Sequence, residues 1–211
     1  MGFDLSGENP IVNGTAPKEP NWETATKEEK DLYFKKSREF QEQNPGIYFR
    51  NNVWWWRPLW GYICDTCGDV LTEEDQAAGC FNDWHLIEED KAIKIAERLQ
   101  AMVNMGHTFE FMKTYMKDLE DKPDEKCEFC NGTGIRVWSE KDIEIHARTV
   151  DAISDLLNTD LPVITKEKTT KCNACGGKGK RRPFETNYPF NVQNVEDFIK
   201  FSSQSGGFRI G

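Results

Sequence analysis

Residues 127–134 read CEFCNGTG, a Cys-x-x-Cys pair followed by a Gly-x-Gly turn. A structural zinc ion takes four ligands in a tetrahedron, so two thiolates make only half of such a site. Residues 172–179 read CNACGGKG and repeat the pattern. The glycines suit a turn that folds tightly around a metal, because glycine adopts positive φ angles without steric cost. The spacing therefore predicts one zinc site with four ligands: Cys127, Cys130, Cys172 and Cys175.

This zinc is expected to be structural, since four thiolates leave no open position for water. A redox dithiol usually opens a helix whose dipole lowers the thiol pKa, whereas glycines follow both pairs here. Between the half-sites, Ser139 and Asp142 predict a capped helix with an apolar stripe from Ile143 to Leu157. The stretch VITKEKTTK at 163–171 predicts a strand. The metal would then close a strand–helix–strand insert at its base.

A second group of candidate ligands comes earlier in the chain. Cys64 and Cys67 stand in CDTCGD, and Cys80 and His85 stand in CFNDWH. Together they would make a second zinc site of the Cys₃His type. The alternative is a free Cys-x-x-Cys beside a core cysteine and an ordinary histidine. If Cys80 or His85 is not a ligand, an open site that holds water becomes an option.

Composition sets the broad class. The 211 residues are 37% hydrophobic and 12% aromatic, which allows one elaborated domain or two small ones with a real core. No apolar run approaches the roughly 20 residues that a membrane span needs, and no signal peptide opens the chain, so we expect a soluble cytoplasmic protein without membrane contact. Six of the seven cysteines form Cys-x-x-Cys pairs, which in the cytosol favours metal over disulfides.

The net charge of −9 argues against non-specific binding to nucleic acid, which relies on cations that neutralise phosphates. A local basic cluster keeps nucleic-acid binding as an alternative. It surrounds the second half-site and consists of Lys171, Lys178, Lys180, Arg181 and Arg182.

The remaining pattern predicts an α+β fold with a small mixed sheet and several helices. MGFDLSG at the start predicts a strand, and Thr26 with Glu29 predicts a capped helix to about residue 42. Apolar residues at helical spacing predict further helices over 86–105 and 108–119, and the tail predicts a helix and a short strand. We expect an aromatic-rich domain at 1–122, the zinc knuckle with its helical insert at 123–185, and a C-terminal segment at 186–211 that packs back on the core.

The aromatic run RNNVWWWRPLW at 50–60 predicts a strand or buried segment that Pro58 interrupts. In a strand, Trp54 and Trp56 would share one face. Burial on both sides is one interpretation. The other is a recognition platform for a nucleotide-like ligand, in which aromatic and guanidinium groups stack on a ring. Its candidate residues are Arg50, Trp54, Trp56, Arg57, Asn82 and Asp83.

Two resemblances bear on function. The two Cys-x-x-Cys-x-Gly-x-Gly octets resemble the cysteine-rich zinc domain of DnaJ-type chaperones, in which such repeats pair into zinc sites; the His-Pro-Asp signature of a J-domain is absent. Several blocks also resemble an uncharacterised bacteriophage-type family: MGFDLSG, YFRNNVWWWRPLW, NDWH, the two octets and YPFNVQNVEDFIKFSSQSGGF. This second resemblance implies a viral origin, and hence action in the host cytoplasm.

We therefore interpret the chain as a zinc-binding protein that acts by binding a host protein or a nucleotide-like ligand, with interference in host regulation or defence as its role. DnaJ-like modules with one zinc serve as protein-interaction modules, which favours binding over catalysis. One alternative is a metal-dependent enzyme that acts on nucleotides or nucleic acid, with Asp83, His85 and the arginines of the tryptophan run (Arg50 and Arg57) at its site. The other is a nucleic-acid-binding module that uses the basic knuckle.

Overall fold

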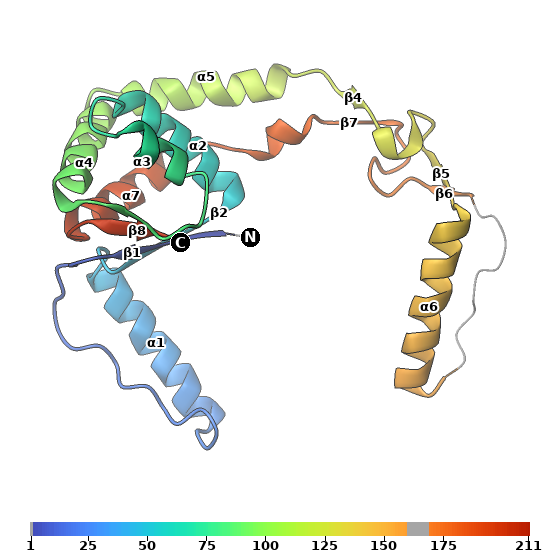
Figure 1. Cartoon of the computed structure of the whole chain (residues 1–211), viewed down its shortest axis with the longest axis horizontal. Coiled ribbons are helices and arrows are strands. Elements are labelled where there is room, and N and C mark those ends of the chain that lie inside the picture. Colours follow the sequence, from blue (N-terminus) through green and yellow to red (C-terminus); the bar gives the residue numbers. More distant parts are fainter. Residues whose placement is uncertain (1, 160–168) are drawn as a thin grey trace. The chain divides into compact units, whose positions relative to one another are not determined.

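The computed structural model describes residues 2–159 and 169–211 of the chain. The chain divides into two compact units. The core unit comprises Met1–Glu120 and Asn187–Gly211, and the insert unit comprises Asp121–Thr186. Helices dominate, and the strands form small sheets, so the α+β class predicted from the sequence is confirmed (Figure 1).

The core unit contains a four-stranded sheet in the order β2-β1-β8-β3. The strands are β1 (Gly2–Gly7), β2 (Tyr48–Asn52), β3 (His85–Ile87) and β8 (Phe208–Ile210). β1 pairs with both β2 and β8, so the two ends of the chain lie side by side in the centre of the sheet (Figure 1). Every strand pair described is antiparallel, which corrects the expectation of a mixed sheet.

The aromatic run forms a helix where we expected a strand. β2 ends at Asn52, whose side chain accepts hydrogen bonds from the backbone N–H groups of Trp54 and Trp55 at 3.0 and 3.2 Å. This N-cap starts α2 (Val53–Thr66), which contains Pro58. Buried side chains recur at helical spacing along α2: Trp56, Leu59, Trp60 and Ile63. The run is therefore mainly core, as the burial interpretation held, but on a helix.

The core unit contains further helices, and the sequence predicts all of them except the shortest. They are α1 (Lys27–Gln43), α3 (Glu73–Ala78), α4 (Glu89–Asn104), α5 (His107–Asp121) and α7 (Val192–Gln204). The capping box of α1 is confirmed, because Thr26 Oγ1 accepts from Glu29 N and Glu29 Oε2 accepts from Thr26 N. α4 packs along α7, and the hydroxyl of Ser202 donates to the Ala92 carbonyl at 2.9 Å. Phe3 of β1 stacks on Trp56 of α2, and this contact packs α2 against the sheet.

The insert unit is built from two short ribbons and one helix. β4 (Glu125–Lys126) pairs with β7 (Lys180–Arg181), and β5 (Ile135–Val137) pairs with β6 (Thr169–Lys171). Between β5 and β6 runs α6 (Glu140–Leu157), capped by Ser139 and Asp142 as predicted. Short 3-10 turns lie at Glu128–Cys130 and Phe184–Asn187. The strand predicted over 163–171 is described only from 169 on; its first part lies outside the described residues.

None of the helices in the described parts of the chain is both long enough and apolar enough to cross a membrane.

Candidate metal centre

Two nearly identical turns present the four cysteines. In the first, the Cys127 carbonyl accepts from Gly132 N at 3.1 Å, and the Cys130 carbonyl accepts from Thr133 N at 2.9 Å. In the second turn, the carbonyls of the two cysteines accept from Gly177 N and Lys178 N at 3.0 and 3.1 Å. Glycines at positive φ make both turns feasible, because an L side chain there would be strained. The sequence repeat is thus a structural repeat.

The two turns are joined by reciprocal backbone hydrogen bonds. Cys127 N donates to the Gly179 carbonyl, and Cys172 N donates to the Gly134 carbonyl, each at 2.9 Å. The approach is close: a Cβ on Gly134 would lie 2.3 Å from the Gly177 oxygen, and a Cβ on Gly179 would lie 2.2 Å from the Gly132 oxygen. The last glycine of each octet therefore lets one half-site dock on the other.

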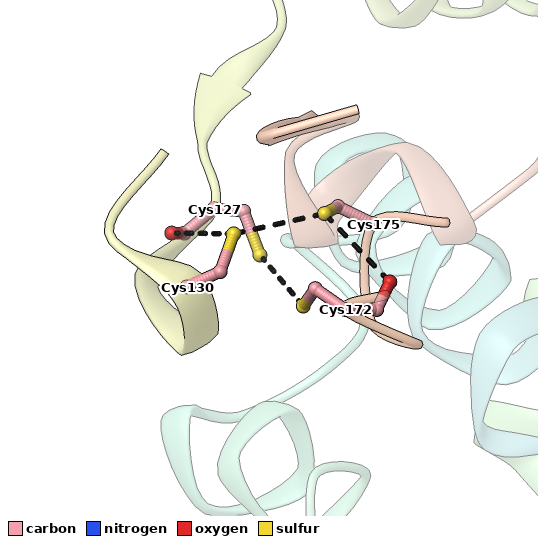
Figure 2. Close-up of side chains that lie close together, drawn as sticks. All are labelled: Cys127, Cys130, Cys172 and Cys175. Atoms are coloured by element: carbon pink, nitrogen blue, oxygen red, sulfur yellow. Dashed lines mark hydrogen bonds between the residues drawn. The ribbon is translucent and has the colours of Figure 1, made fainter. Parts of the chain in front are cut away.

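The cysteine sulfurs converge at the centre of this junction. The Sγ atoms of Cys127 and Cys172 lie 3.9 Å apart, and those of Cys130 and Cys175 lie 3.7 Å apart (Figure 2). All four ligand atoms lie within 4.8 Å of one another, and all four residues are buried. Four sulfurs at about 2.3 Å from a tetrahedral zinc would be about 3.8 Å apart. A disulfide needs about 2.05 Å, so these are free thiols arranged for a metal.

Backbone amides add to the electrostatics of the site. Gly134 N donates to Cys130 Sγ, and Gly179 N donates to Cys175 Sγ, both at 3.3 Å. Burial by itself raises the pKa of Cys175, but the Gly179 amide and the neighbouring thiols outweigh it and bring the pKa down to about 7. Burial raises the pKa of Cys127 to about 11, with Cys130 adding to the rise. A metal that binds here must displace protons, and amide donors to sulfur favour the thiolate form.

The Cys₃His group predicted around residues 64–85 is not gathered in the same way. Among the described residues, the four-cysteine cluster is the one group whose ligand atoms meet metal-binding distances. Cys64 lies in the last turn of α2 and Cys67 is its C-cap, at the end of a helix whose dipole disfavours a thiolate. Burial raises the pKa of Cys64 to about 12, and the nearby Cys80 thiol adds to this effect. Cys80 itself is exposed.

His85 contacts a buried carboxylate. Its Nε2 lies 2.8 Å from Asp75 Oδ1, and Lys91 Nζ lies 2.5 Å from Asp75 Oδ2. Asp75 is buried, and its carboxylate also accepts from the backbone and hydroxyl of Thr72. Burial would raise the pKa of Asp75, but Lys91, His85 and Thr72 hold it well below its usual range. We did not predict this network from the sequence; its one local signal is the capping box that Thr72 and Asp75 form three positions apart.

The residues of the predicted recognition platform take separate roles. Trp56 is fully buried and its Nε1 donates to the Gly79 carbonyl at 2.7 Å, so its ring is not available to a ligand. Trp54 and Arg57 both contact Tyr188: the ring centroids of Trp54 and Tyr188 lie 5.0 Å apart, and the Arg57 guanidinium lies over the Tyr188 ring. The three remaining candidates are placed as follows: Arg50 Nε lies 3.5 Å from Asp4, Asn82 donates to the Gly2 carbonyl at 3.0 Å, and Asp83 is exposed.

Comparison of the chain with protein-family models, with curated proteins and with solved structures found no match in any of the three. Functional inference therefore rests on the site itself.

Proposed function

We propose that this protein is a zinc-stabilised binding protein, in which the four-cysteine site is structural and the insert unit is the binding module. The observation that carries the proposal is the set of four buried sulfurs at tetrahedral spacing. An S₄ donor set suits zinc or iron, and zinc is the usual metal of glycine-flanked Cys-x-x-Cys knuckles. Held in this way, the metal would fasten together the two chain segments from which the insert unit is built.

Exposed apolar side chains on the insert unit favour a protein as the partner. α6 buries Val150 but leaves Ile145, Leu156 and Leu157 exposed, and both Ile135 and Val137 of β5 are exposed as well. Apolar side chains that gather on one small unit are typical of a protein-interaction surface. A metal that fastens the chain segments of this unit together contributes rigidity, which lowers the entropic cost of binding.

The basic cluster gives less support to nucleic-acid binding. Lys180 Nζ lies 3.2 Å from Asp124, Arg181 lies 3.9 Å from Glu128, and Arg182 donates to the Lys122 carbonyl at 2.6 Å. These contacts divert cationic groups that would otherwise neutralise phosphates. The enzyme alternative needs an open coordination position, and four thiolates fill a tetrahedral ion.

The sequence blocks that resemble the bacteriophage-type family support a further part of the proposal. The protein would be of viral origin, would act in the host cytoplasm and would bind a host protein so as to interfere with regulation or defence. The resemblance of the octets to the DnaJ-type zinc module is consistent with a binding role.

A site-specific photo-crosslinker tests the binding role. We would place it at Leu156, which is 83% exposed, and at Lys141 as a control on the same helix, then irradiate bacterial cells. The proposal predicts one discrete crosslinked protein for position 156, lost when Cys172→Ser removes a zinc ligand, and no such product for position 141. Equal, diffuse crosslinking at both positions would refute it.

A further inference from the structure

The insert unit contains a cavity of about 410 Å³ whose wall is made by the β5–β6 ribbon and the first half of α6. This volume falls within the range of small-molecule sites, about 300–1,000 Å³. The cavity lies outside the aromatic run that first suggested a ligand site. The side chains that matter for its chemistry are Arg136, Trp138 and Thr170 from the ribbon and Asp142, His146 and Thr149 from the helix.

Local sequence explains why these side chains face one another. Arg136 is paired with Thr170 across the ribbon, and Trp138 follows two residues later, so the three share a face. The capped start of α6 then brings Asp142 back to Arg136, and Arg136 Nη2 donates to Asp142 Oδ1 at 2.8 Å. Trp138 Nε1 donates to Thr170 Oγ1 at 3.2 Å. These two contacts fasten the ribbon to the helix and fix the walls.

Two polar groups in these walls have unused hydrogen-bonding capacity. Within the described part of the chain, Arg136 uses one of its five N–H donors in the Asp142 ion pair, and its side chain is 41% exposed. The Nε2 atom of His146 is buried and has no hydrogen-bond partner in the described part of the chain. A buried polar atom without a partner requires an explanation.

The lining combines a guanidinium group with aromatic and aliphatic side chains. Arg136 supplies the cationic group of the lining and is paired with the carboxylate of Asp142, whereas the side chain of Lys171 lies over Gly177 of the second cysteine turn. The indole of Trp138 meets the His146 ring edge-to-face at a centroid distance of 5.2 Å, and Ile145 adds an aliphatic surface. Guanidinium donors recognise phosphate, and an indole face accepts a planar heterocycle.

We propose that this cavity binds a mononucleotide, with the phosphate at Arg136 and the base against Trp138. The inference rests on the proposed zinc site, because Cys172 continues directly from β6 and bonds to the Gly134 carbonyl just before β5. Without the metal, the ribbon that forms one wall loses its anchor. The site thus gives the zinc a role in small-ligand capture as well as in stability.

Calorimetric titration of the zinc-loaded full chain with AMP tests the proposal. The comparison ligands are adenosine, which lacks the phosphate, and ribose 5-phosphate, which lacks the base. AMP should bind at least about tenfold more tightly than either comparison ligand. Arg136→Gln should weaken AMP about tenfold or more and leave adenosine unchanged. Trp138→Leu should weaken both AMP and adenosine about fivefold or more.

Arg148→Gln is the matched control. Arg148 lies on the same helix and pairs with Glu144, yet does not line the cavity, so its loss should leave AMP affinity unchanged. Zinc content is measured for every sample. Zinc-loaded protein that does not bind AMP, or equal losses in Arg136→Gln and Arg148→Gln, overturns the nucleotide site and leaves the zinc proposal intact. A chain that holds no zinc refutes the zinc proposal. If that zinc-free chain still binds AMP, the nucleotide site stands without the metal. If it does not bind AMP, both proposals are refuted.

Discussion

Gly134 offers the sharpest test of how the half-sites dock. An alanine at position 134 would carry the strain of φ +75° and would place its Cβ 2.3 Å from the Gly177 oxygen. Ordinary contact needs about 3.4 Å, so the two turns must separate by roughly 1 Å. Gly176 is a matched control, because it also has positive φ (+58°) but an added Cβ there meets nothing within 4 Å.

The expected magnitudes follow from these contacts. Both substitutions cost about 1–2 kcal/mol for the left-handed conformation. Gly134→Ala also weakens the hydrogen bond from Cys172 N to the Gly134 carbonyl, which costs about 1 kcal/mol of stability, and it adds the strain of separating the turns. The difference between the variants should be about 2 kcal/mol, or roughly 30-fold in zinc affinity, because metal binding is coupled to folding of the knuckle.

A competition titration against a chromophoric zinc chelator measures this difference. The two-turn geometry predicts that Gly134→Ala loses zinc at far lower chelator concentrations than Gly176→Ala. Equal zinc affinity in the two variants would show that the turns do not need to approach so closely, and the docking account would be wrong.

Three further predictions concern the core unit and the response to acid. Asp75→Asn should lower the free energy of unfolding by about 2 kcal/mol at pH 7, measured by urea denaturation, whereas Asp83→Asn should have no effect. Since folding depresses the pKa of Asp75, its contribution is present above the unfolded value of about 3.9 and is lost as the pH falls towards the folded value, so the gap between Asp75→Asn and wild type should narrow in acid. Trp56→Ala should lower the free energy of unfolding by about 3–5 kcal/mol, and Trp22→Ala, at a half-exposed position, should lower it far less. Similar losses in the two variants would contradict the burial of Trp56. Acidification should release the metal, because protons compete for the thiolates, and zinc retained at pH 3 would contradict thiolate ligation.

The four-cysteine cluster could be predicted from the sequence because its information is local. Each Cys-x-x-Cys-x-Gly-x-Gly octet encodes its own turn, and the four-ligand rule requires two such turns to meet. The caps at Thr26 and Ser139 were predictable for the same reason: a side chain bonds to a backbone amide three residues away.

The aromatic run shows where local pattern is ambiguous. Aromatic and β-branched residues favour a strand, and Pro58 disfavours a helix interior. The spacing of Trp56, Leu59, Trp60 and Ile63 fits a helix, and Asn52 supplies the cap that decides between the two. Burial on one helical face against β1 and α7 outweighed the intrinsic preference.

Contacts between distant segments were beyond the sequence. Asp75, His85 and Lys91 belong to α3, β3 and α4, and nothing in their spacing predicts that they converge. The cavity in the insert unit depends likewise on a ribbon whose second strand begins more than thirty residues after Arg136, with Thr170 opposite it. A one-dimensional pattern fixes which residues share a face, but not which faces meet.

X-ray absorption at the metal edge of the purified full chain tests the central claim most directly. The account predicts one zinc per chain with four sulfur neighbours at about 2.3 Å and no nitrogen or oxygen in the first shell. A shell that contains a light-atom ligand would mean an open site and would contradict a purely structural metal. Iron in place of zinc would refute the zinc assignment, and a metal-free chain with cystines at residues 127–175 would refute the site altogether.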